Sequence, residues 1–203
     1  EFVDVTFKYP NTNDYILKNC SFKMQSKKKY ALVGVNGAGK STIIKLITGM
    51  YNDYSGKILL NGLDIKDYDY TMLKGIISVV FQDFCKYETT VKDNIIVGRG
   101  FEYDQNEVNN IIDKLELNEL NENLKNGLDT TIGKAIEEGV DLSGGQWQKL
   151  AISRLLYSDA QINILDEPTA ALDPIAEGNT YKLFDSVSDE KFVIYISLID
   201  LAQ

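Results

Sequence analysis

A glycine-rich stretch near the start of the chain has the residue types that bind a triphosphate. Residues 34–41 read Gly-Val-Asn-Gly-Ala-Gly-Lys-Ser and fit the pattern G-x-x-x-x-G-K-[ST]. Glycines let the backbone turn so that successive N–H groups point at phosphate oxygens. We expect Lys40 to reach the terminal phosphates and the Ser41 hydroxyl to coordinate Mg²⁺. Because a chance match to the fixed positions is rare, we interpret the stretch as a nucleotide site.

A pair of carboxylates follows an apolar stretch later in the chain. Ile162–Leu165 leads directly into Asp166 and Glu167, and Pro168 comes next. In phosphoryl transfer an acidic residue at a strand end holds Mg²⁺, the role that we assign to Asp166. Glu167 could act as general base on the attacking water. By itself the stretch would be read as an acidic turn before a proline; the phosphate loop upstream favours the catalytic interpretation.

A third stretch, Leu142-Ser143-Gly144-Gly145-Gln146, is a candidate for a second phosphate cradle. Ser143 followed by Gln146 is also a capping box, so a well-formed helix start would explain it. A serine hydroxyl, two glycine N–H groups and a helix N-terminus can equally hold phosphate. Since one nucleotide cannot easily use both cradles of one chain, this arrangement predicts two chains, each offering its cradle to the other's ATP.

Apolar patterns predict the strands and helices that position these motifs. The expected strands are Phe2–Phe7, Tyr15–Leu17, Ser21–Met24, Tyr30–Val33, Ile162–Leu165 and Phe192–Ile196, with a hairpin element at Gly56–Gly62. The expected helices are Ser41–Thr48 (ended by Gly49), Val108–Leu117 and Gln146–Tyr157, with a further helix-like segment between the last two strands. Strands alternating with helices favour an α/β core, here with an antiparallel start and a helical insertion.

Composition limits the classes of protein that fit. The chain has 203 residues, 44% hydrophobic and 25% charged, which is ordinary for a globular domain. A net charge of −9 argues against nucleic-acid binding, which needs basic patches. Cys20 and Cys85 match no metal-binding spacing and are interpreted as reduced thiols. The longest nearly uninterrupted apolar run, Ile76–Phe81, is far shorter than the roughly 20 residues of a membrane helix.

The motifs stand in the order found in the nucleotide-binding domain of ABC transporters, which the chain resembles over nearly its whole length. In sequence order the matching motifs are an aromatic (Tyr9), Walker A (Gly34–Thr42), a glutamine after a strand (Gln82), the signature (Leu142–Gln146), Walker B (Ile162–Glu167) and the D-loop (Ala171–Asp173). This resemblance implies a P-loop NTPase (RecA-like) core with an N-terminal antiparallel β-subdomain and an inserted α-helical subdomain. The core would cover about residues 1–83 and 159–203, and the helical subdomain about 84–158.

The resemblance also implies roles for single residues, with ATP and Mg²⁺ as ligands. Tyr9 would stack on adenine, although a lone tyrosine is more often a half-buried strand residue. Gln82 would contact Mg²⁺ and sense the transmembrane partner, and Asp173 would communicate across the dimer. The nucleotide contacts would come from Tyr9, Asn36, Gly37, Ala38, Gly39, Lys40, Ser41 and Thr42. The metal set would be Ser41, Gln82 and Asp166, and the catalytic set Lys40, Gln82 and Glu167.

Finer features resemble the exporters of this family. Phe81–Phe84, followed by Tyr87 and Thr90–Ile95, is similar to their coupling region, and Glu138–Asp141 to their X-loop. The stretches around the signature and Walker B look most like bacterial peptide and lantibiotic exporters. The implied partners are a second nucleotide-binding domain, in a homo- or heterodimer, and a transmembrane domain, with no nucleic acid. The implied location is the cytoplasmic face of the bacterial plasma membrane.

Other ATPases share these motifs. A stand-alone importer subunit is the main alternative. A DNA-repair or chromosome-maintenance ATPase head would need a coiled-coil insertion and a basic surface, and a translation-factor ATPase would carry two such domains in tandem. The sequence shows neither feature. It does not identify the cargo.

The final strand departs from the family pattern. In the family this strand ends in serine or threonine followed by a histidine that contacts the γ-phosphate. Here Ser197 is followed by Leu198, and the chain contains no histidine. Two explanations remain open: the protein has lost this histidine, or residues between Ser197 and Leu198 are missing from the sequence. We expect the C-terminal part to be incomplete.

Overall fold

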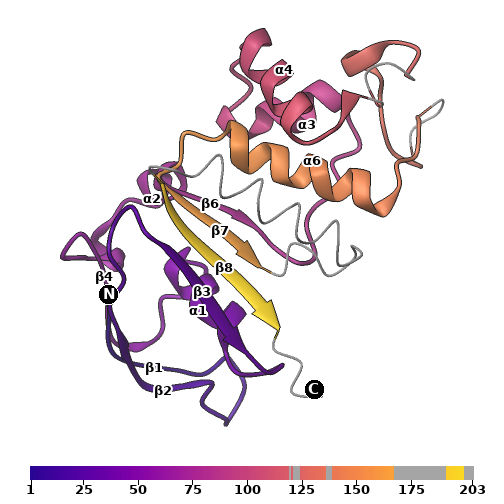
Figure 1. Ribbon diagram of the computed structural model, residues 1–203. Helices are drawn as coiled ribbons and strands as arrows, with labels where there is room; N and C mark the ends of the chain where they lie inside the picture. Colours follow the sequence, from indigo (N-terminus) through magenta and orange to yellow (C-terminus); the bar gives the residue numbers. More distant parts are fainter. Residues whose placement is uncertain (119, 121–123, 136–138, 167–190, 199–203) are drawn as a thin grey trace. The chain divides into compact units, whose positions relative to one another are not determined.

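The computed structural model describes residues 1–118, 120, 124–135, 139–166 and 191–198 (Figure 1). The chain divides into two compact units. Unit 1 contains Glu1–Ile77 with Gln161–Glu167 and Glu190–Gln203, and unit 2 contains Ser78–Ala160 with Pro168–Asp189. The limits that the sequence suggested for the helical subdomain stay a prediction. Among the described residues no helix is both long and apolar enough to cross a membrane.

Unit 1 begins with an antiparallel sheet. Its strands are β1 (Phe2–Phe7), β2 (Leu17–Phe22), β4 (Ser55–Leu60) and β5 (Leu63–Asp64), in the spatial order β2-β1-β4-β5. The hairpin between β4 and β5 turns at Asn61 and Gly62, which both have positive φ, as a two-residue type I′ turn requires. The two short strands predicted at Tyr15–Leu17 and Ser21–Met24 are wrong, because β2 is continuous. As an edge strand it carries exposed polar residues at its centre, which hid it from the apolar pattern.

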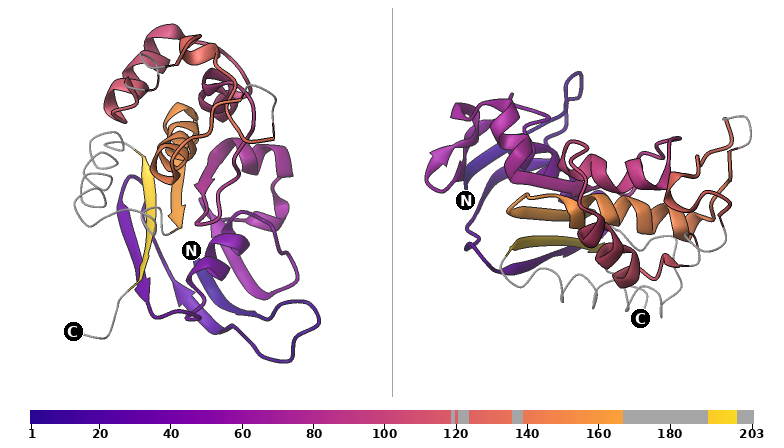
Figure 2. Two further views of the ribbon diagram at one scale, coloured as in Figure 1. Left: turned by 90° about the vertical axis from the view of Figure 1, so that its right-hand side faces the viewer. Right: turned by 90° about the horizontal axis from the view of Figure 1, so that it is seen from above.

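The second sheet of unit 1 is parallel and contains β3 (Lys29–Gly34), β8 (Phe192–Leu198) and β7 (Ile162–Asp166), with β8 in the middle. Figure 2 shows β7 and β8 side by side. Every residue of β7 is buried, which explains its uninterrupted apolar sequence. Because the strands are parallel, the carboxyl ends of β3 and β7 lie at the same edge of this sheet. That edge is where ligands bind in open α/β sheets.

Helix α1 (Lys40–Ile47) follows β3 directly and buries Ile44, Leu46 and Ile47. It ends in a Schellman motif: the Gly49 N–H donates to the Leu46 carbonyl and the Met50 N–H to the Lys45 carbonyl, each at 3.0 Å. Gly49 has φ +71°, the left-handed conformation that this motif requires. The predicted helix and its glycine stop are therefore confirmed to within one residue. A 3₁₀ turn (Ile65–Asp67) and α2 (Tyr70–Ile76) lead to β6 (Ile77–Val80), which begins in unit 1 and ends in unit 2.

Unit 2 is mainly helical. It contains α3 (Val91–Ile96), α4 (Gln105–Lys114) and α6 (Gly144–Tyr157), with 3₁₀ turns at Val97–Arg99 and Gly127–Asp129. Helices α3 and α4 both pack against α6 (Figure 1). A side-chain cap begins each helix: Thr90 for α3, Asp104 for α4 and Ser143 for α6. The buried apolar side chains of this core include Ile95, Val108, Ile111, Trp147, Leu150 and Leu155.

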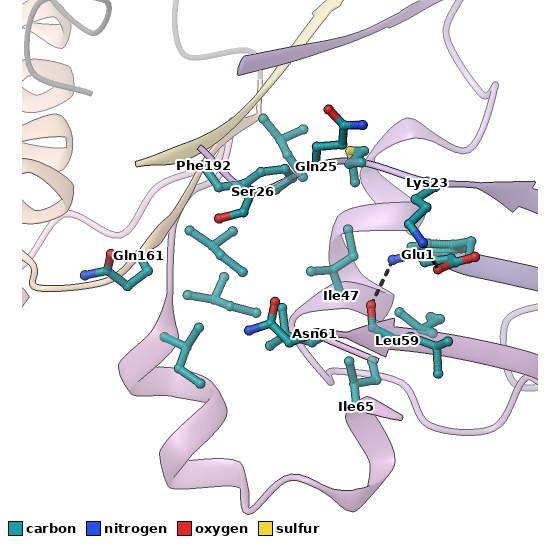
Figure 3. Close-up of a pocket in the computed structure, with 18 of the residues that line it drawn as sticks. Glu1, Lys23, Gln25, Ser26, Ile47, Leu59, Asn61, Ile65, Gln161 and Phe192 are labelled. Atoms are coloured by element: carbon teal, nitrogen blue, oxygen red, sulfur yellow. Dashed lines mark hydrogen bonds and ion pairs between the residues drawn. The ribbon is translucent and has the colours of Figure 1, made fainter. Parts of the chain in front are cut away.

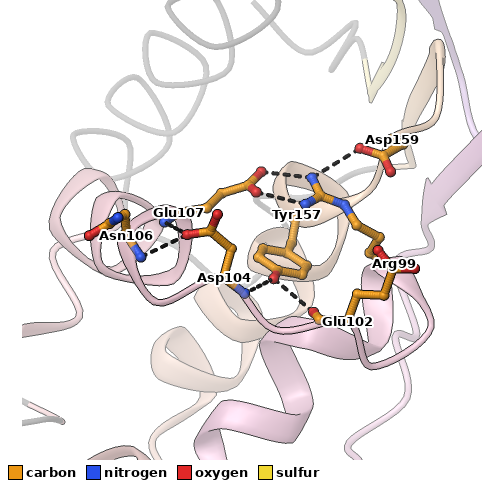
Figure 4. Close-up of polar contacts among 7 residues, drawn as sticks. All are labelled: Arg99, Glu102, Asp104, Asn106, Glu107, Tyr157 and Asp159. Carbon is orange, nitrogen blue, oxygen red and sulfur yellow. Dashed lines mark hydrogen bonds and ion pairs between the residues drawn. The ribbon is translucent and has the colours of Figure 1, made fainter.

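Polar contacts connect the carboxyl end of α6 with α4 and with the segment that precedes α4 (Figure 4). Arg99 binds Glu107 through both of its terminal nitrogens, at 2.7 and 2.8 Å, and also Asp159 at 2.9 Å. Its guanidinium lies over the ring of Tyr157, 4.6 Å from the centroid. The Tyr157 hydroxyl donates to the Glu102 carbonyl and accepts from the Asp104 N–H, each at 2.8 Å. Because Tyr157 is fully buried, these bonds fix the carboxyl end of α6.

We predict that Gly98→Ala destabilises unit 2. A Cβ at residue 98 would overlap the backbone carbonyl of Arg154 on α6, and a backbone group cannot rotate away. Overpacking of this kind lowers the free energy of unfolding by about 2 kcal/mol. Urea unfolding measures it. The matched control is Gly75→Ala, since a Cβ there meets nothing within 4 Å. If both variants unfold at the wild-type urea concentration, the close packing of Gly98 on α6 is wrong.

Candidate nucleotide-binding site

The loop between β3 and α1 has the backbone shape of a phosphate loop. Gly37 has φ +79° and Gly39, the residue that caps α1, has φ +87°. A Cβ at residue 39 would lie 3.1 Å from the Leu17 side chain and 3.2 Å from that of Ile16, so only glycine fits comfortably. Asn36, Gly37 and Ala38 are exposed, which leaves their backbone open to a ligand at the helix N-terminus.

Lys40, the first residue of α1, is hydrogen-bonded back to the start of the phosphate loop. Its ammonium donates to the Gly34 carbonyl at 2.7 Å and to the Val35 carbonyl at 3.0 Å. The residue is 9% exposed, although it carries a charge. An ammonium has three donors, so one remains for a further acceptor. The loop therefore holds a nearly buried cation beside glycine N–H groups, which is an environment suited to a phosphate.

Ser41 and Asp166 meet although they are far apart in the sequence. The Ser41 hydroxyl donates to Asp166 Oδ1 at 3.2 Å. Ser41 lies in the first turn of α1, and Asp166 is the last residue of β7, where it is 4% exposed. A hydroxyl and a carboxylate are both hard oxygen donors, the ligands that Mg²⁺ prefers. The residues present thus fit a magnesium ion.

Tyr9 lies next to the phosphate loop. Its hydroxyl and that of Thr42 are 2.9 Å apart and share a hydrogen bond. The rings of Phe7 and Tyr51 both pack edge-to-face with it, at centroid distances of 5.2 and 5.3 Å. The Lys45 ammonium lies 5.6 Å from its centroid. Sequence reasoning missed the contributions of Tyr51 and Lys45, because only the folded chain brings them to Tyr9.

In unit 2 the signature residues form the start of α6. The Gln146 N–H donates to the Ser143 hydroxyl at 3.2 Å, and the Ser143 N–H donates to Gln146 Oε1 at 2.9 Å, so the predicted capping box is confirmed. Leu142 is buried, whereas Ser143 and Gly144 are exposed and Gly145 is half-buried. The first N–H groups of a helix have no partner within it. Here the Gln146 N–H is satisfied by the Ser143 hydroxyl, and the exposed residues Ser143 and Gly144 lie at the start of the helix.

Of the remaining predicted site residues, the structure describes Gln82 but not Glu167 or Asp173. Gln82 is exposed in a turn just after β6 and belongs to unit 2. Glu167 and Asp173 lie outside the described residues, as does the predicted helix-like segment before the last strand. The structure thus brings together Tyr9, the phosphate loop and Asp166 in unit 1, and the signature residues in unit 2. In the parallel sheet residue 198 pairs with Gly34, at the start of the phosphate loop.

A cavity of about 660 Å³ in unit 1 is separate from this site (Figure 3). Gln161, Ile162 and Phe192 line it, and these residues lie at the amino ends of β7 and β8. Gly34 and Asp166 mark the carboxyl ends of strands in the same parallel sheet. The cavity is therefore not the phosphate site.

The fold and the loop define a P-loop nucleotide-binding protein. A family model described as ABC transporter matches residues 17–170, and the chain belongs to this family. This confirms the predicted family and the fold class, a P-loop NTPase core with an antiparallel β-subdomain and a helical part. The match covers most of the chain and includes the phosphate loop, the signature and Asp166. The motifs, the fold and the family match therefore agree.

Known proteins that the chain resembles are transport proteins. The subtilin transport ATP-binding protein SpaT of Bacillus subtilis is 42% identical over 197 residues, 97% of this chain and 32% of that protein. The nisin transport ATP-binding protein NisT of Lactococcus lactis subsp. lactis is 38% identical over 196 residues, 96% of this chain and 33% of that protein. A solved bacterial Atm1-family ABC exporter with ATP bound matches with a TM-score of 0.86 and 33% identity, over 98% of this chain and 34% of that one. The chain thus spans about a third of the length of these relatives.

Proposed function

We propose that this chain is the ATP-hydrolysing domain of an ABC exporter. The observation that carries the proposal is the hydrogen bond between Ser41 and Asp166, next in sequence to the nearly buried Lys40. It places a hydroxyl, a carboxylate and a cation at the same phosphate loop. The relatives support the same function, since they are named as transport ATP-binding proteins and an exporter. ATP would bind with its phosphates on the Gly37–Gly39 backbone and on Lys40. Tyr9 would stack on the adenine.

Magnesium would be held by Ser41 and Asp166, with Gln82 as a further ligand. When bound, the ion neutralises charge on the β- and γ-phosphates. Lys40 would give its remaining N–H donor to the terminal phosphate. Glu167, the residue after Asp166, would accept a proton from the attacking water. These assignments rest on the residue types and, for Ser41 and Asp166, on the contact between them.

The second phosphate cradle supports a working unit of two copies. Ser143, Gly144 and Gly145 expose a hydroxyl and helix N-terminal N–H groups, which a γ-phosphate can bind. We propose that two such domains close head to tail around two ATP molecules, each signature completing the other's site, with Asp173 communicating between them. Closure would drive transmembrane segments from inward- to outward-facing, and hydrolysis would reset them. The domain would then work at the cytoplasmic face of the plasma membrane.

A peptide is the cargo that the relatives favour. SpaT and NisT are named for the transport of subtilin and nisin, and they share 42% and 38% of residues with this chain. The Atm1-family and lipid A-core flippase relatives are equally long matches, so the domain alone does not specify the cargo. We propose export of a peptide of the lantibiotic type. The test is to express the exporter that contains this domain in a host without an exporter for such a peptide, where we expect the peptide to be secreted. Normal ATP hydrolysis without secretion would refute the proposed cargo.

We predict that Ser143→Ala lowers turnover far more than ATP binding. Alanine removes the exposed hydroxyl of the cradle, and with it one hydrogen bond to the γ-phosphate supplied across the dimer. Loss of such a donor costs about 100-fold in kcat. ATP binding to one domain should stay unchanged, which a fluorescent ATP analogue measures. Ser21→Ala in the antiparallel sheet is the control and should change neither quantity. Equal losses of binding and turnover in Ser143→Ala would show that the cradle does not act in trans.

A further inference from the structure

Short backbone segments of unit 2 are joined just ahead of the signature loop. Thr90 pairs with Thr131 in an antiparallel bridge, and Ile132 pairs with Val140 in a parallel bridge. The Ile132 N–H donates to the carbonyl of Thr89 at 2.9 Å. Ile132 is fully buried between these partners. Residues 89–90 are thus bonded to residues 131–132, which are bonded in turn to Val140.

Val140 is the point at which this small ladder reaches the signature. Its N–H donates to the Thr131 carbonyl at 3.1 Å, and its own carbonyl accepts from the Gly133 N–H at 3.0 Å. Leu142, two residues further on, is buried, and Ser143 begins α6. Only Asp141 and Leu142 separate Val140 from Ser143, so few backbone torsions lie between the ladder and the phosphate donors. A displacement of the ladder would be passed to Ser143.

Gly133 and Glu88 fit closely at the edge of this ladder. Gly133 has φ +126°, and a Cβ on it would overlap the Cβ, Cγ and Cδ atoms of Glu88. The N–H of Ala135 points at Glu88 Oε1, 3.5 Å away. The Glu88 side chain therefore lies directly over Gly133. No other residue type can take position 133 unless one of the two segments moves.

The same segment that carries Glu88 also holds α6 from a second side. Arg154 of α6 donates to the Cys85 carbonyl and to Asn94 Oδ1, each at 2.6 Å. Its guanidinium lies 4.3 Å from the centroid of the Tyr87 ring. Asn94 is fully buried and donates back to the Tyr87 carbonyl at 2.9 Å. Burial lowers the pKa of the Arg154 guanidinium.

We propose that Glu88 and Gly133 are positioning residues for the signature cradle. Residues 85–90 are bonded to α6 through Arg154 and to the segment entering the loop through Thr89, so both sides of residues 142–146 are fixed to one segment. The Gly133–Glu88 fit sets the spacing on the entry side. This inference rests on the proposed function, because it assumes that the cradle completes a partner's ATP site.

The test is ATP hydrolysis and ATP binding by Gly133→Ala. The added methyl group should push the ladder from residue 88 and displace the cradle, lowering kcat about tenfold. The dissociation constant of a fluorescent ATP analogue, measured on the same protein, should change by less than about twofold. Gly100→Ala is the matched control. Gly100 also has positive φ (+64°), but a Cβ there meets nothing within 4 Å, so kcat should stay near wild type.

A rescue variant separates positioning from simple loss of structure. Glu88→Gly removes the side-chain atoms nearest to the new Cβ, so the double variant Glu88→Gly/Gly133→Ala should regain the part of the lost kcat that this overlap causes. The backbone strain of an alanine at φ +126° remains in both variants. A double variant no faster than Gly133→Ala overturns the inference. So does a Gly133→Ala variant that keeps wild-type kcat, or one that loses ATP binding by the same factor as kcat.

A second variant answers the question if Gly133→Ala does not fold. Val140→Pro removes the N–H that donates to the Thr131 carbonyl, and it should lower kcat with ATP binding unchanged. Wild-type kcat in that variant overturns the inference. The proposed function fails in a different way, since the wild-type protein would then hydrolyse no ATP. An active wild type with an equally active Gly133→Ala variant refutes the positioning role alone.

Discussion

Lys40→Ala should bind ATP about 100-fold more weakly than wild type, because a charge-assisted hydrogen bond to the terminal phosphate is lost. The structure adds a second reason. Lys40 also ties the loop together through the Gly34 and Val35 carbonyls, so its removal loosens the backbone that should surround the phosphates. Equilibrium binding of a fluorescent ATP analogue measures the effect, and hydrolysis should fall at least as much.

Two controls separate the contributions of charge and of fit. Lys57→Ala removes an exposed positive charge from β4, in the same unit, and should leave ATP binding unchanged. Lys40→Arg keeps the charge but replaces a compact ammonium with a planar fork, and it should also bind poorly. If Lys40→Ala binds ATP as wild type does, residues 34–41 are not the phosphate site.

Glu167→Gln should keep ATP binding and lose almost all turnover. Glutamine has the shape of glutamate but cannot accept the proton of the attacking water, and removal of a general base slows hydrolysis by about 1,000-fold. Steady-state release of phosphate measures the rate. The control is Glu116→Gln, an exposed carboxylate of unit 2 that forms a long ion pair with Lys149, at 3.8 Å. That change should leave turnover unchanged. Wild-type turnover in Glu167→Gln would mean that another group is the base.

The sequence predicted best the parts of the fold whose physical cause is local. The helix after the phosphate loop was identified from its apolar spacing and its glycine stop, and the structure adds the Schellman bonds at Gly49. The capping box at Ser143 was likewise readable, because both partners lie within one turn. The strands at Ile162–Leu165 and Phe192–Ile196 were found because each is a short, largely apolar run. Strand β2 was split into two, since an edge strand with exposed polar residues gives little apolar signal.

Contacts between distant segments could not be predicted from the sequence. The motif pattern assigned Ser41 and Asp166 to one metal ion, but their hydrogen bond depends on the parallel register of the sheet. The hydroxyl contact between Tyr9 and Thr42 depends on how the segment after β1 folds against α1, which no spacing rule encodes. The close fit of Gly133 against Glu88 is of the same kind, because a glycine in a loop gives no sign of what lies over it.

The most direct test of the central claim is an ATP-dependent cross-link between two copies. One population would carry Asn36→Cys in the phosphate loop, and a differently tagged one Asp141→Cys beside the signature. Both would also carry Glu167→Gln to prevent hydrolysis, with Cys20 and Cys85 replaced by serine. Because each copy has a single cysteine, a disulfide between the two tags must join different molecules.

The account predicts that, with ATP and Mg²⁺, oxidation joins the two tags and that without nucleotide it does not. A protein that binds ATP fully yet never forms the bond between positions 36 and 141, or forms it equally without ATP, would contradict the head-to-tail ATP sandwich.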